Sequence, residues 1–223
     1  MKGGKSILSK FNFNGVNLMN LIYKKKEFLI LIFANLIAQL GITYYFMNKT
    51  NNPDIGIWPL FGIQLVIIYI LVLIPMPPIV KFIVFGIFSW TFGLSMSHLK
   101  TKYDPQMLDI AIKGALAIFG LMLTVGVVLV GGGIRLGYQF GSLLFDALLA
   151  LIIAKIVNMF GPQLSIVKKA LSYVGLGLFS LFIIWDTNNV LDRDYKGDFI
   201  TASMDYYLDI LNLFSNLLGI GDD

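Results

Sequence analysis

The stretch MLDIAIKGALAIFGLMLTVGVVLV, residues 107–130, decides the fold class of this chain. Its only charged residues are Asp109 and Lys113, and it is longer than the roughly 20 apolar residues that an α-helix needs to cross a bilayer. No alternation of polar and apolar residues, which would indicate a half-buried β-strand, competes with this interpretation. The stretch therefore predicts a transmembrane helix.

The composition extends this prediction to the whole chain of 223 residues, of which 57% are hydrophobic and 13% charged. Soluble domains carry roughly 25% charged residues, so a membrane is the expected environment. Apolar runs separated by turn-forming segments cover residues 27–46, 55–74, 79–99, 107–130, 136–158, 170–191 and 200–219. We predict an all-α polytopic membrane protein with about seven transmembrane helices. It would comprise a basic leader (1–26), a single membrane domain (27–219) and an acidic tail (220–223).

The charged and reactive residues exclude several function classes. The formal net charge is +4, and most lysines lie beside apolar runs, which suits lipid headgroups better than nucleic acid. The chain has no cysteine, which excludes disulfides and thiolate metal sites, and its one histidine, His98, excludes paired-histidine metal sites. We expect no cofactor. The expected partners are the lipid bilayer, calcium or another cation, and other membrane subunits.

The lysines and arginines also predict an orientation. With an inward N-terminus, the inside would hold the six lysines of the leader together with Lys81, Arg135, Arg193 and Lys196. The outside would hold only Lys49, Lys100, Lys102, Lys168 and Lys169, so the positive-inside rule favours this orientation. The basic, acid-free leader is similar to a mitochondrial presequence. The mitochondrial inner membrane, the endoplasmic reticulum and the bacterial plasma membrane all stay open.

Polar side chains at helical spacing mark faces that turn toward protein or water. Hydrogen bonds between helices are the expected role of such stripes. The stripes are Asn35, Gln39 and Thr43 in the first run, and Gln139, Ser142 and Asp146 in the fifth.

Ionised groups inside the apolar runs need partners, because an unpaired charge is costly there. Asp109 and Lys113 lie four residues apart with the acid first, which predicts a structural ion pair within one helix. Asp146 lies near the middle of its run and requires a partner on another helix or a wet cavity. Lys113 is one candidate for that partner.

The last two runs carry the most unusual pattern. In MDYYLDILNLFSNLLG, residues 204–219, four polar residues recur at spacings of four, three and four along an otherwise apolar helix. Such a helix belongs at the centre of a bundle or in a re-entrant position beside a wet cavity. The preceding run ends in a second polar group, and antiparallel helices would bring the two groups to the same side of the membrane. The pore or polar-line candidates are Asp205, Asp209, Asn212 and Asn216 in the last run, and Asp186, Asn188 and Asn189 before it, with Asp146 of the fifth run as a further candidate.

The motifs FIIWDTNNVL (182–191) and DYYLDILNLFSNLLG (205–219) resemble the C-terminal signature of the transmembrane Bax inhibitor motif (Bax inhibitor/Lifeguard) family. The resemblance is close over about the last 45 residues. It implies a central seventh helix wrapped by six others and, in bacterial members, a calcium-permeable leak gated by protonation of two aspartates. These aspartates map onto Asp186 and Asp209.

The chain departs from the family pattern at two places. Gln64 and Thr91 stand where many members have a membrane-embedded glutamate, and Lys81 stands where a bacterial relative has an arginine that latches one sensor aspartate. Two hypotheses follow. The chain is a pH-sensitive calcium leak channel or ion-homeostasis protein, or it is a non-conducting structural or regulatory subunit of a larger membrane complex, for example in mitochondria.

Elementary chemistry allows a proton-sensitive cation site at the two aspartates. Two carboxyl groups held close together titrate as a coupled pair. Calcium takes six to eight oxygen ligands, and Asp186 and Asp209 with nearby amides and water are a candidate weak site. The alternative is a carboxyl–carboxylate hydrogen bond that only holds two helices together.

No enzyme motif is complete in this chain. An intramembrane aspartyl protease needs a Gly-x-Gly-Asp sequence, whereas Gly175-Leu176-Gly177 is followed by Leu178. The loop from Asp192 to Ser203 begins like an EF-hand, but Lys196 and Ser203 occupy positions that need calcium ligands. We therefore predict a non-enzymatic protein with a solvated turn at this loop.

Overall fold

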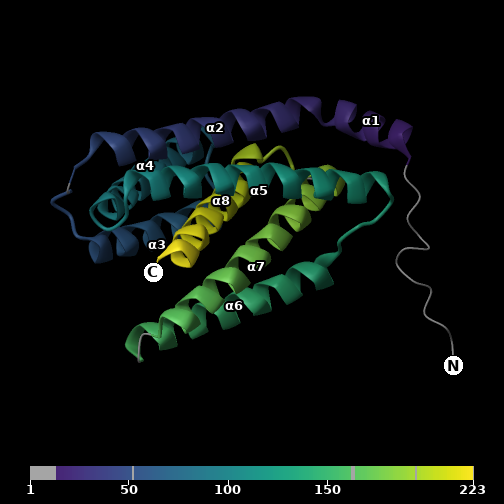
Figure 1. Cartoon of the computed structure of the whole chain (residues 1–223). Coiled ribbons are helices and arrows are strands. Elements are labelled where there is room, and N and C mark those ends of the chain that lie inside the picture. The colour runs from purple at the N-terminus through teal and green to yellow at the C-terminus, as the bar shows by residue number, and fades with distance from the viewer. Residues whose placement is uncertain (1–13, 52, 162–163, 194, 223) are drawn as a thin grey trace, which may run out of the picture. The chain divides into compact units, whose positions relative to one another are not determined.

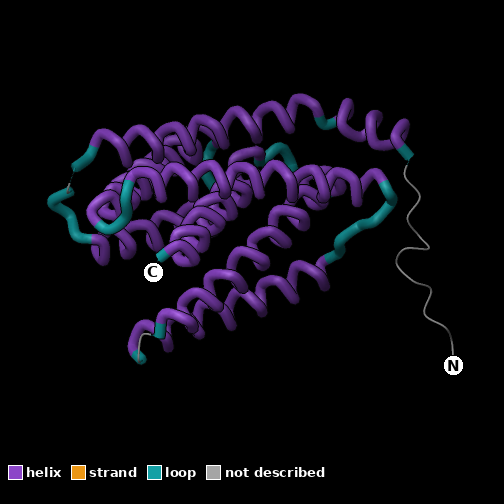
Figure 2. Tube along the Cα trace, viewed as in Figure 1, coloured by secondary structure: helices purple, strands orange, loops and turns teal. Residues whose placement is uncertain are grey.

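The computed structural model describes residues 14–51, 53–161, 164–193 and 195–222, and the regular elements in these ranges are all helical (Figure 2). The predicted all-α fold is therefore confirmed. In chain order the helices are α1 (Gly15–Lys24), α2 (Lys26–Lys49), α3 (Ile57–Leu73), α4 (Pro78–Ser97), the short 3-10 helix η2 (His98–Thr101), α5 (Pro105–Gly131), α6 (Tyr138–Phe160), α7 (Ser165–Asp192) and α8 (Phe199–Gly221) (Figure 1).

Five helical segments are long and apolar enough to cross a membrane. They are α2, α4 together with η2, α5, α6 and α7. The helix α3 is apolar but has 17 residues, and α8 has 23 residues but carries the predicted polar line. With these two, the chain is consistent with about seven transmembrane helices.

The helix α1 was not predicted, because its sequence is short and mixed in polarity. It begins after Asn14, whose side-chain oxygen accepts a hydrogen bond from the backbone N–H of Asn17 at 3.0 Å. This contact is a typical N-cap, which satisfies a backbone donor that the first helical turn leaves open. Lys2, Lys5 and Lys10 of the predicted leader lie outside the described residues.

The contacts divide the chain into two compact units. The first comprises Met1–Glu27, Ala111–Asp194 and Asp209–Asp223, and the second comprises Phe28–Ile110 and Tyr195–Leu208. The first unit thus holds α6, α7 and most of α5 and α8, while the second holds α3, α4 and most of α2. The single membrane domain over residues 27–219 stays a prediction.

In the first unit, α6 and α7 lie side by side as an antiparallel hairpin (Figure 1). Leu144, Leu151 and Leu178 form the buried cluster between them. Small residues bring the helices of this unit close: a Cβ atom at Gly141 would lie 2.2 Å from the ring of Trp185, and one at Gly126 would lie 2.6 Å from Thr187. Such close approach is the usual way in which helices pack in membranes.

In the second unit, aromatic side chains join α4 to the first half of α8. The ring of Tyr207 meets Phe85 edge-on at 5.1 Å and Phe88 at 6.0 Å, and all three side chains are buried. The ring of Phe33 from α2 stacks on Tyr206 at 6.1 Å. These contacts cover the residues that flank the polar line of α8. Most side chains of α8 are buried.

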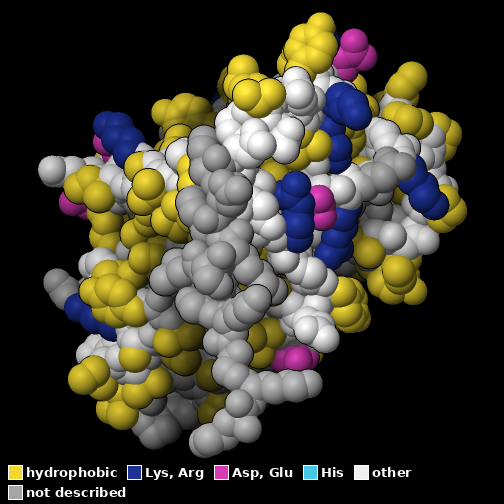
Figure 3. Space-filling view, turned by 90° about the vertical axis from the view of Figure 1, so that its right-hand side faces the viewer, with side chains coloured by type: hydrophobic (Ala, Val, Ile, Leu, Met, Phe, Trp, Pro, Cys, Tyr) yellow, Lys and Arg dark blue, Asp and Glu magenta, His cyan; other side chains and the backbone are white. Residues whose placement is uncertain are grey.

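Large hydrophobic side chains are also exposed in many places, and Figure 3 shows several of these yellow areas on one face. They come from the outward faces of the apolar helices, and include Ile37, Val66, Ile83, Leu121, Ile153 and Val174. Exposed apolar surface of this extent indicates contact with lipid.

Candidate functional site

Asp186 and Asp209 lie together inside the first unit. Asp186 is in the last two turns of α7 and Asp209 is near the middle of α8, and each is 5% exposed. Their carboxyl groups are hydrogen-bonded to each other. A carboxylate can only accept, so one of the two groups must carry the proton that makes this bond. We call this pair the dyad.

Two basic side chains, Arg193 and Lys25, lie beside the end of α7 that carries Asp186. The guanidinium of Arg193 lies over the ring of Trp185, 5.5 Å from its centroid, and attracts the carboxylate form of Asp186. Lys25 donates to the backbone oxygen of Val190 at 2.9 Å and to that of Arg193, which caps the last carbonyl groups of α7. Cations at this end suit the negative end of the helix dipole.

Asn188 has a structural role that the sequence did not reveal. Its amide nitrogen donates to the backbone oxygen of Ile134 at 3.0 Å, and its amide oxygen accepts from the backbone N–H of Leu136 at 2.9 Å. Both ends of the amide therefore hold the loop that joins α5 to α6. Asn189, the next residue, is also buried.

The predicted polar line of α8 is largely buried. Asp209 and Asn216 are buried, and Asp205 and Asn212 are partly buried. The amide nitrogen of Asn216 donates to the backbone oxygen of Asn212 at 2.7 Å, while its oxygen accepts from Lys155 at 2.9 Å.

Lys155, on α6, is a residue that the sequence reasoning missed. The signal was present, because a lysine interrupts the apolar stretch LLALIIAKIVNMF, residues 148–160. An ionisable residue within a membrane helix is by default a candidate functional residue.

The stripe predicted on the first apolar run forms hydrogen bonds between helices, as expected. Asn35 donates to Ser203 of α8 at 2.5 Å, and Ser89 of α4 donates to Gln39 at 2.8 Å. The hydroxyls of Thr43 and Tyr207 lie 2.5 Å apart. The network is fully buried and joins α2 to α4 and α8 within the second unit.

The sequence matches the family model described as "Inhibitor of apoptosis-promoting Bax1" over residues 21–221. The chain belongs to this Bax inhibitor family. The predicted family and the integral, multi-pass membrane location are thereby confirmed. Because the family consists of membrane proteins that are not enzymes, the prediction of a non-enzymatic chain is confirmed as well.

Individual relatives in the Bax inhibitor family come from eukaryotes, bacteria and a virus. Protein LIFEGUARD 1 of Arabidopsis thaliana is 30% identical over 142 residues, which cover 62% of this chain and 58% of that protein. Bax inhibitor 1 of Schizosaccharomyces pombe is 27% identical over 209 residues, 88% of this chain and 76% of the relative. The Golgi anti-apoptotic protein of vaccinia virus is 39% identical over 80 residues, 36% of this chain and 33% of the relative. The aligned region thus spans less than two thirds of LIFEGUARD 1.

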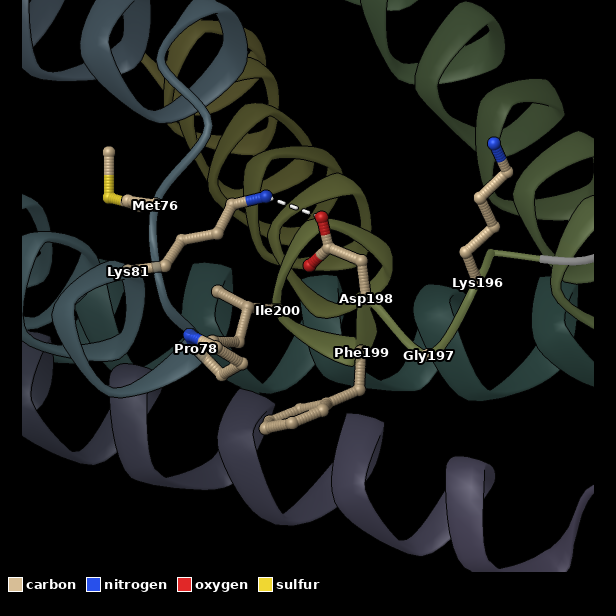
Figure 4. A pocket seen from close by; sticks show the side chains of 8 residues that line it. All are labelled: Met76, Pro78, Lys81, Lys196, Gly197, Asp198, Phe199 and Ile200. Carbon is tan, nitrogen blue, oxygen red and sulfur yellow. Dashed lines mark hydrogen bonds and ion pairs between the residues drawn. The ribbon is translucent and has the colours of Figure 1, made fainter.

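Lys81 of α4, which the resemblance relates to the latch arginine of a bacterial relative, binds Asp198. Its ammonium lies 2.5 Å from Asp198 (Figure 4). It also donates to the hydroxyl of Thr201. Asp198 in turn accepts from the backbone N–H of Thr201 at 3.0 Å, which caps the start of α8. Lys81 and Asp198, together with Met76, Pro78 and residues of the loop before α8, border a cavity of about 190 Å³.

The charge state of Asp198 follows from these contacts. Partial burial raises the pKa of the Asp198 carboxyl, but the hydrogen bonds from Lys81 and Thr201 together lower it more, so that its pKa lies below the ordinary value. Asp198 is therefore ionised at neutral pH. This carboxylate is engaged with Lys81. That the 192–203 loop is not an EF-hand stays a prediction.

The charged residues that the sequence singled out on α5 and α6 lie on exposed faces. Asp146 is exposed on α6, and Asp109 and Lys113 are exposed on α5. The ion pair between Asp109 and Lys113, and a partner for Asp146, stay predictions. Gln64, by contrast, is buried on α3 and donates to Ser95 at 2.8 Å.

Within the described ranges, no group of three or more His, Asp or Glu side chains is placed to hold a metal ion. Calcium at the dyad would therefore depend on two carboxyl groups supplemented by amides and water, which suits a weakly held passing ion better than a resident one. Asn188 is a poor additional ligand, because both ends of its amide already bind backbone.

Proposed function

We propose that this member of the Bax inhibitor family is a pH-sensitive cation leak, with calcium as the expected ion, that serves ion homeostasis. Asp186 and Asp209 would be its proton-sensitive site, and the polar line of α8 would be the path. The observation that supports this proposal best is the hydrogen bond between two buried carboxyl groups on neighbouring helices.

The proposed mechanism follows from the chemistry of the dyad. With one shared proton, the bond between Asp186 and Asp209 joins α7 to α8. Loss of that proton removes the bond and leaves two negative charges close together in surroundings of low dielectric, where they repel each other and attract a cation. A proton and a calcium ion therefore compete for the same oxygen atoms, and cation passage must depend on pH.

The test is calcium flux into liposomes that contain the purified chain, at acidic and at alkaline pH. We expect a pH-dependent flux whose pH dependence is reduced or removed in Asp186→Asn and in Asp209→Asn. The matched control is Asp54→Asn, which makes the same change of charge in the exposed loop before α3 and should leave the pH dependence intact. If well-folded protein gives no flux at any pH, the leak is rejected and the dyad is a structural hydrogen bond.

A non-conducting subunit of a larger membrane complex is the second candidate. It is favoured by the use of Lys81 to bind Asp198 and by the amide contact of Lys155, both of which hold helices together. Extraction in mild detergent separates the two candidates. A stoichiometric partner that co-purifies would favour the subunit, and a free monomer would count against it.

A further inference from the structure

Lys155 is a cationic side chain within the apolar helix α6. The mechanism proposed above does not use it. Lys155 lies five residues before the end of α6 at Phe160, so its backbone is about 7 Å from that end at 1.5 Å per residue. A charge at this position is costly unless a polar group receives it. Its ammonium donates to the side-chain oxygen of Asn216 at 2.9 Å.

Asn216 is a fixed acceptor for this ammonium. Its side chain is 1% exposed, and its amide nitrogen donates to the backbone oxygen of Asn212. An ammonium only donates and a backbone carbonyl only accepts, so one orientation of the amide satisfies both partners. Gly175 of α7 leaves the space that the amide occupies, since a Cβ atom there would lie 2.3 Å from the amide oxygen.

The partner of Lys155 differs from the acidic partners of three other basic residues. Lys81 pairs with Asp198, Arg135 with Asp192 and Lys168 with Asp222. In the described part of the chain, the partner of the Lys155 ammonium is instead a neutral amide. The positive charge of Lys155 is therefore not neutralised by a bound acid.

The Lys155 ammonium lies at one end of the polar line of α8. Asp209, Asn212 and Asn216 follow one face of the helix, with the dyad at Asp209 and the ammonium at Asn216. Seven residues separate the two ends, a distance of about 10 Å along the axis. A cation that leaves the dyad along this line would approach a fixed positive charge.

We propose that Lys155 is a charge barrier that limits cation passage along the polar line of α8. The inference rests on the proposed leak. It makes Lys155 a determinant of the rate of cation passage and of selectivity between cations and anions. The hydrogen bond to Asn216 holds the ammonium at one end of the polar line of α8. The dyad supplies the opposite charge at the other end, at Asp209.

The test compares Lys155→Gln, which removes the charge but keeps a donor for Asn216, with Lys155→Arg, which keeps the charge. Both are measured as full-length protein in liposomes, with calcium, potassium and chloride as probes. Lys155→Gln should raise cation flux by about threefold to tenfold, because one repelling charge is removed. It should also raise the ratio of potassium to chloride permeability. Lys155→Arg should match the unchanged protein, and Lys113→Gln, an exposed lysine of α5, is the control.

A second measurement covers the case in which Lys155→Gln does not fold. The chain has no cysteine, so Lys155→Cys provides a unique thiol for methanethiosulfonate reagents. Attachment of an ethylammonium group should return cation flux to that of the unchanged protein, and attachment of an ethylsulfonate group should raise it above that of the unmodified variant. Equal flux in all three states would overturn the barrier.

The outcomes for the leak and for the barrier are distinguishable. If the unchanged protein conducts and responds to Asp186→Asn while Lys155→Gln alters neither flux nor selectivity, the barrier is wrong and the leak stands. If the unchanged protein gives no flux but Lys155→Gln conducts, the barrier is supported, and the proposal that the unchanged protein leaks is wrong. If neither protein gives a flux, both proposals are rejected.

Discussion

At the scale of single residues, buried amides and carboxyl groups at the end of α7 serve different partners although they are adjacent in sequence. Asp186 binds a side chain of α8, whereas Asn188 binds the backbone of the loop between α5 and α6. The side chain of Thr187, between them, donates to the backbone oxygen of Ile183 and packs on Gly126. The polar run DTNN thus joins α7 to three other parts of the first unit.

Replacement of Asn188 by alanine should destabilise the protein without a change of charge. The loop would lose two hydrogen bonds and keep one backbone N–H and one carbonyl group without their partner. The expected loss is about 1–3 kcal/mol of unfolding free energy. Thermal unfolding in detergent measures it. Asn48→Ala, which removes an exposed amide bound only to its own helix, is the control and should have little effect. Equal melting temperatures for both variants would contradict the role of Asn188.

The ion pair of Asp198 predicts a pH dependence of stability. The pKa of this carboxyl in the folded protein is below its ordinary value of about 4. Its stabilisation is therefore complete above pH ~4 and is lost as the pH falls through the folded pKa. Asp198→Asn should melt at a lower temperature than the unchanged protein at pH 7, and the difference should shrink toward pH 3.

Thermal unfolding at pH 7, 5 and 3 would measure this effect, with Asp54→Asn as the control for a general change of charge. A difference that is the same at pH 3 as at pH 7 would mean that Asp198 acts through its shape and not through its charge. Asp198 is partly exposed, so the expected effect is small.

The sequence predicted the members of the site better than it predicted their contacts. An acid within an apolar run is a strong signal, and it marked both Asp186 and Asp209. Their selection as a pair came from the family resemblance. The acid that binds Lys81 was not found, because 117 residues separate the two partners and no spacing rule relates them. The backbone contacts of Asn188 were not predicted, since a polar residue in a membrane helix has the same signal whether it binds backbone or an ion.

At the scale of helices, the apolar runs predicted the elements and most of their ends. The run at 107–130 became Pro105–Gly131, and the run at 200–219 became Phe199–Gly221. The largest difference is at α7, which begins at Ser165 instead of 170 because its first turns carry Lys168 and Lys169. Hydrophobicity marks the part of a helix that lipid or protein covers, whereas the backbone hydrogen bonds continue into polar turns.

The packing of α7 on α8 depends on glycine at one position of α7 and not at another. A Cβ atom at Gly175 would lie 2.3 Å from the amide of Asn216, whereas one at Gly177 would meet nothing within 4 Å. We expect Gly175→Ala to destabilise the protein by about 1–3 kcal/mol, because the amide or the helix must move. Gly177→Ala should be neutral or stabilising by up to about 1 kcal/mol, since alanine favours a helix.

Thermal unfolding of the two glycine variants gives a direct comparison, because they make the same change two residues apart on one helix. If Gly175→Ala is as stable as Gly177→Ala, the close approach of α7 and α8 at Asn216 is wrong. The inferred position of the Lys155 ammonium would then lose its support as well.

At the scale of the whole molecule, the remaining question is whether α8 crosses the bilayer or re-enters it. Its 23 residues span about 34 Å, enough for a hydrocarbon core of about 30 Å. The polar line would oppose crossing only if it faced lipid, and Asp209 and Asn216 are buried. We therefore expect α8 to cross, with its start inside and its end outside, because the positive-inside rule places Lys196 inside.

Single cysteines in this cysteine-free chain test the prediction with a maleimide that does not cross membranes. With the N-terminus inside, Lys196→Cys should be labelled only after the membrane is opened, whereas Gly221→Cys, at the end of α8, should be labelled in intact vesicles. Lys49→Cys is the control for an outside position, and the unchanged chain should take up no label. Labelling of residues 196 and 221 from the same side would show that α8 re-enters. A polar line on such a helix could reach water from one side only, so the proposed leak would then need a different path.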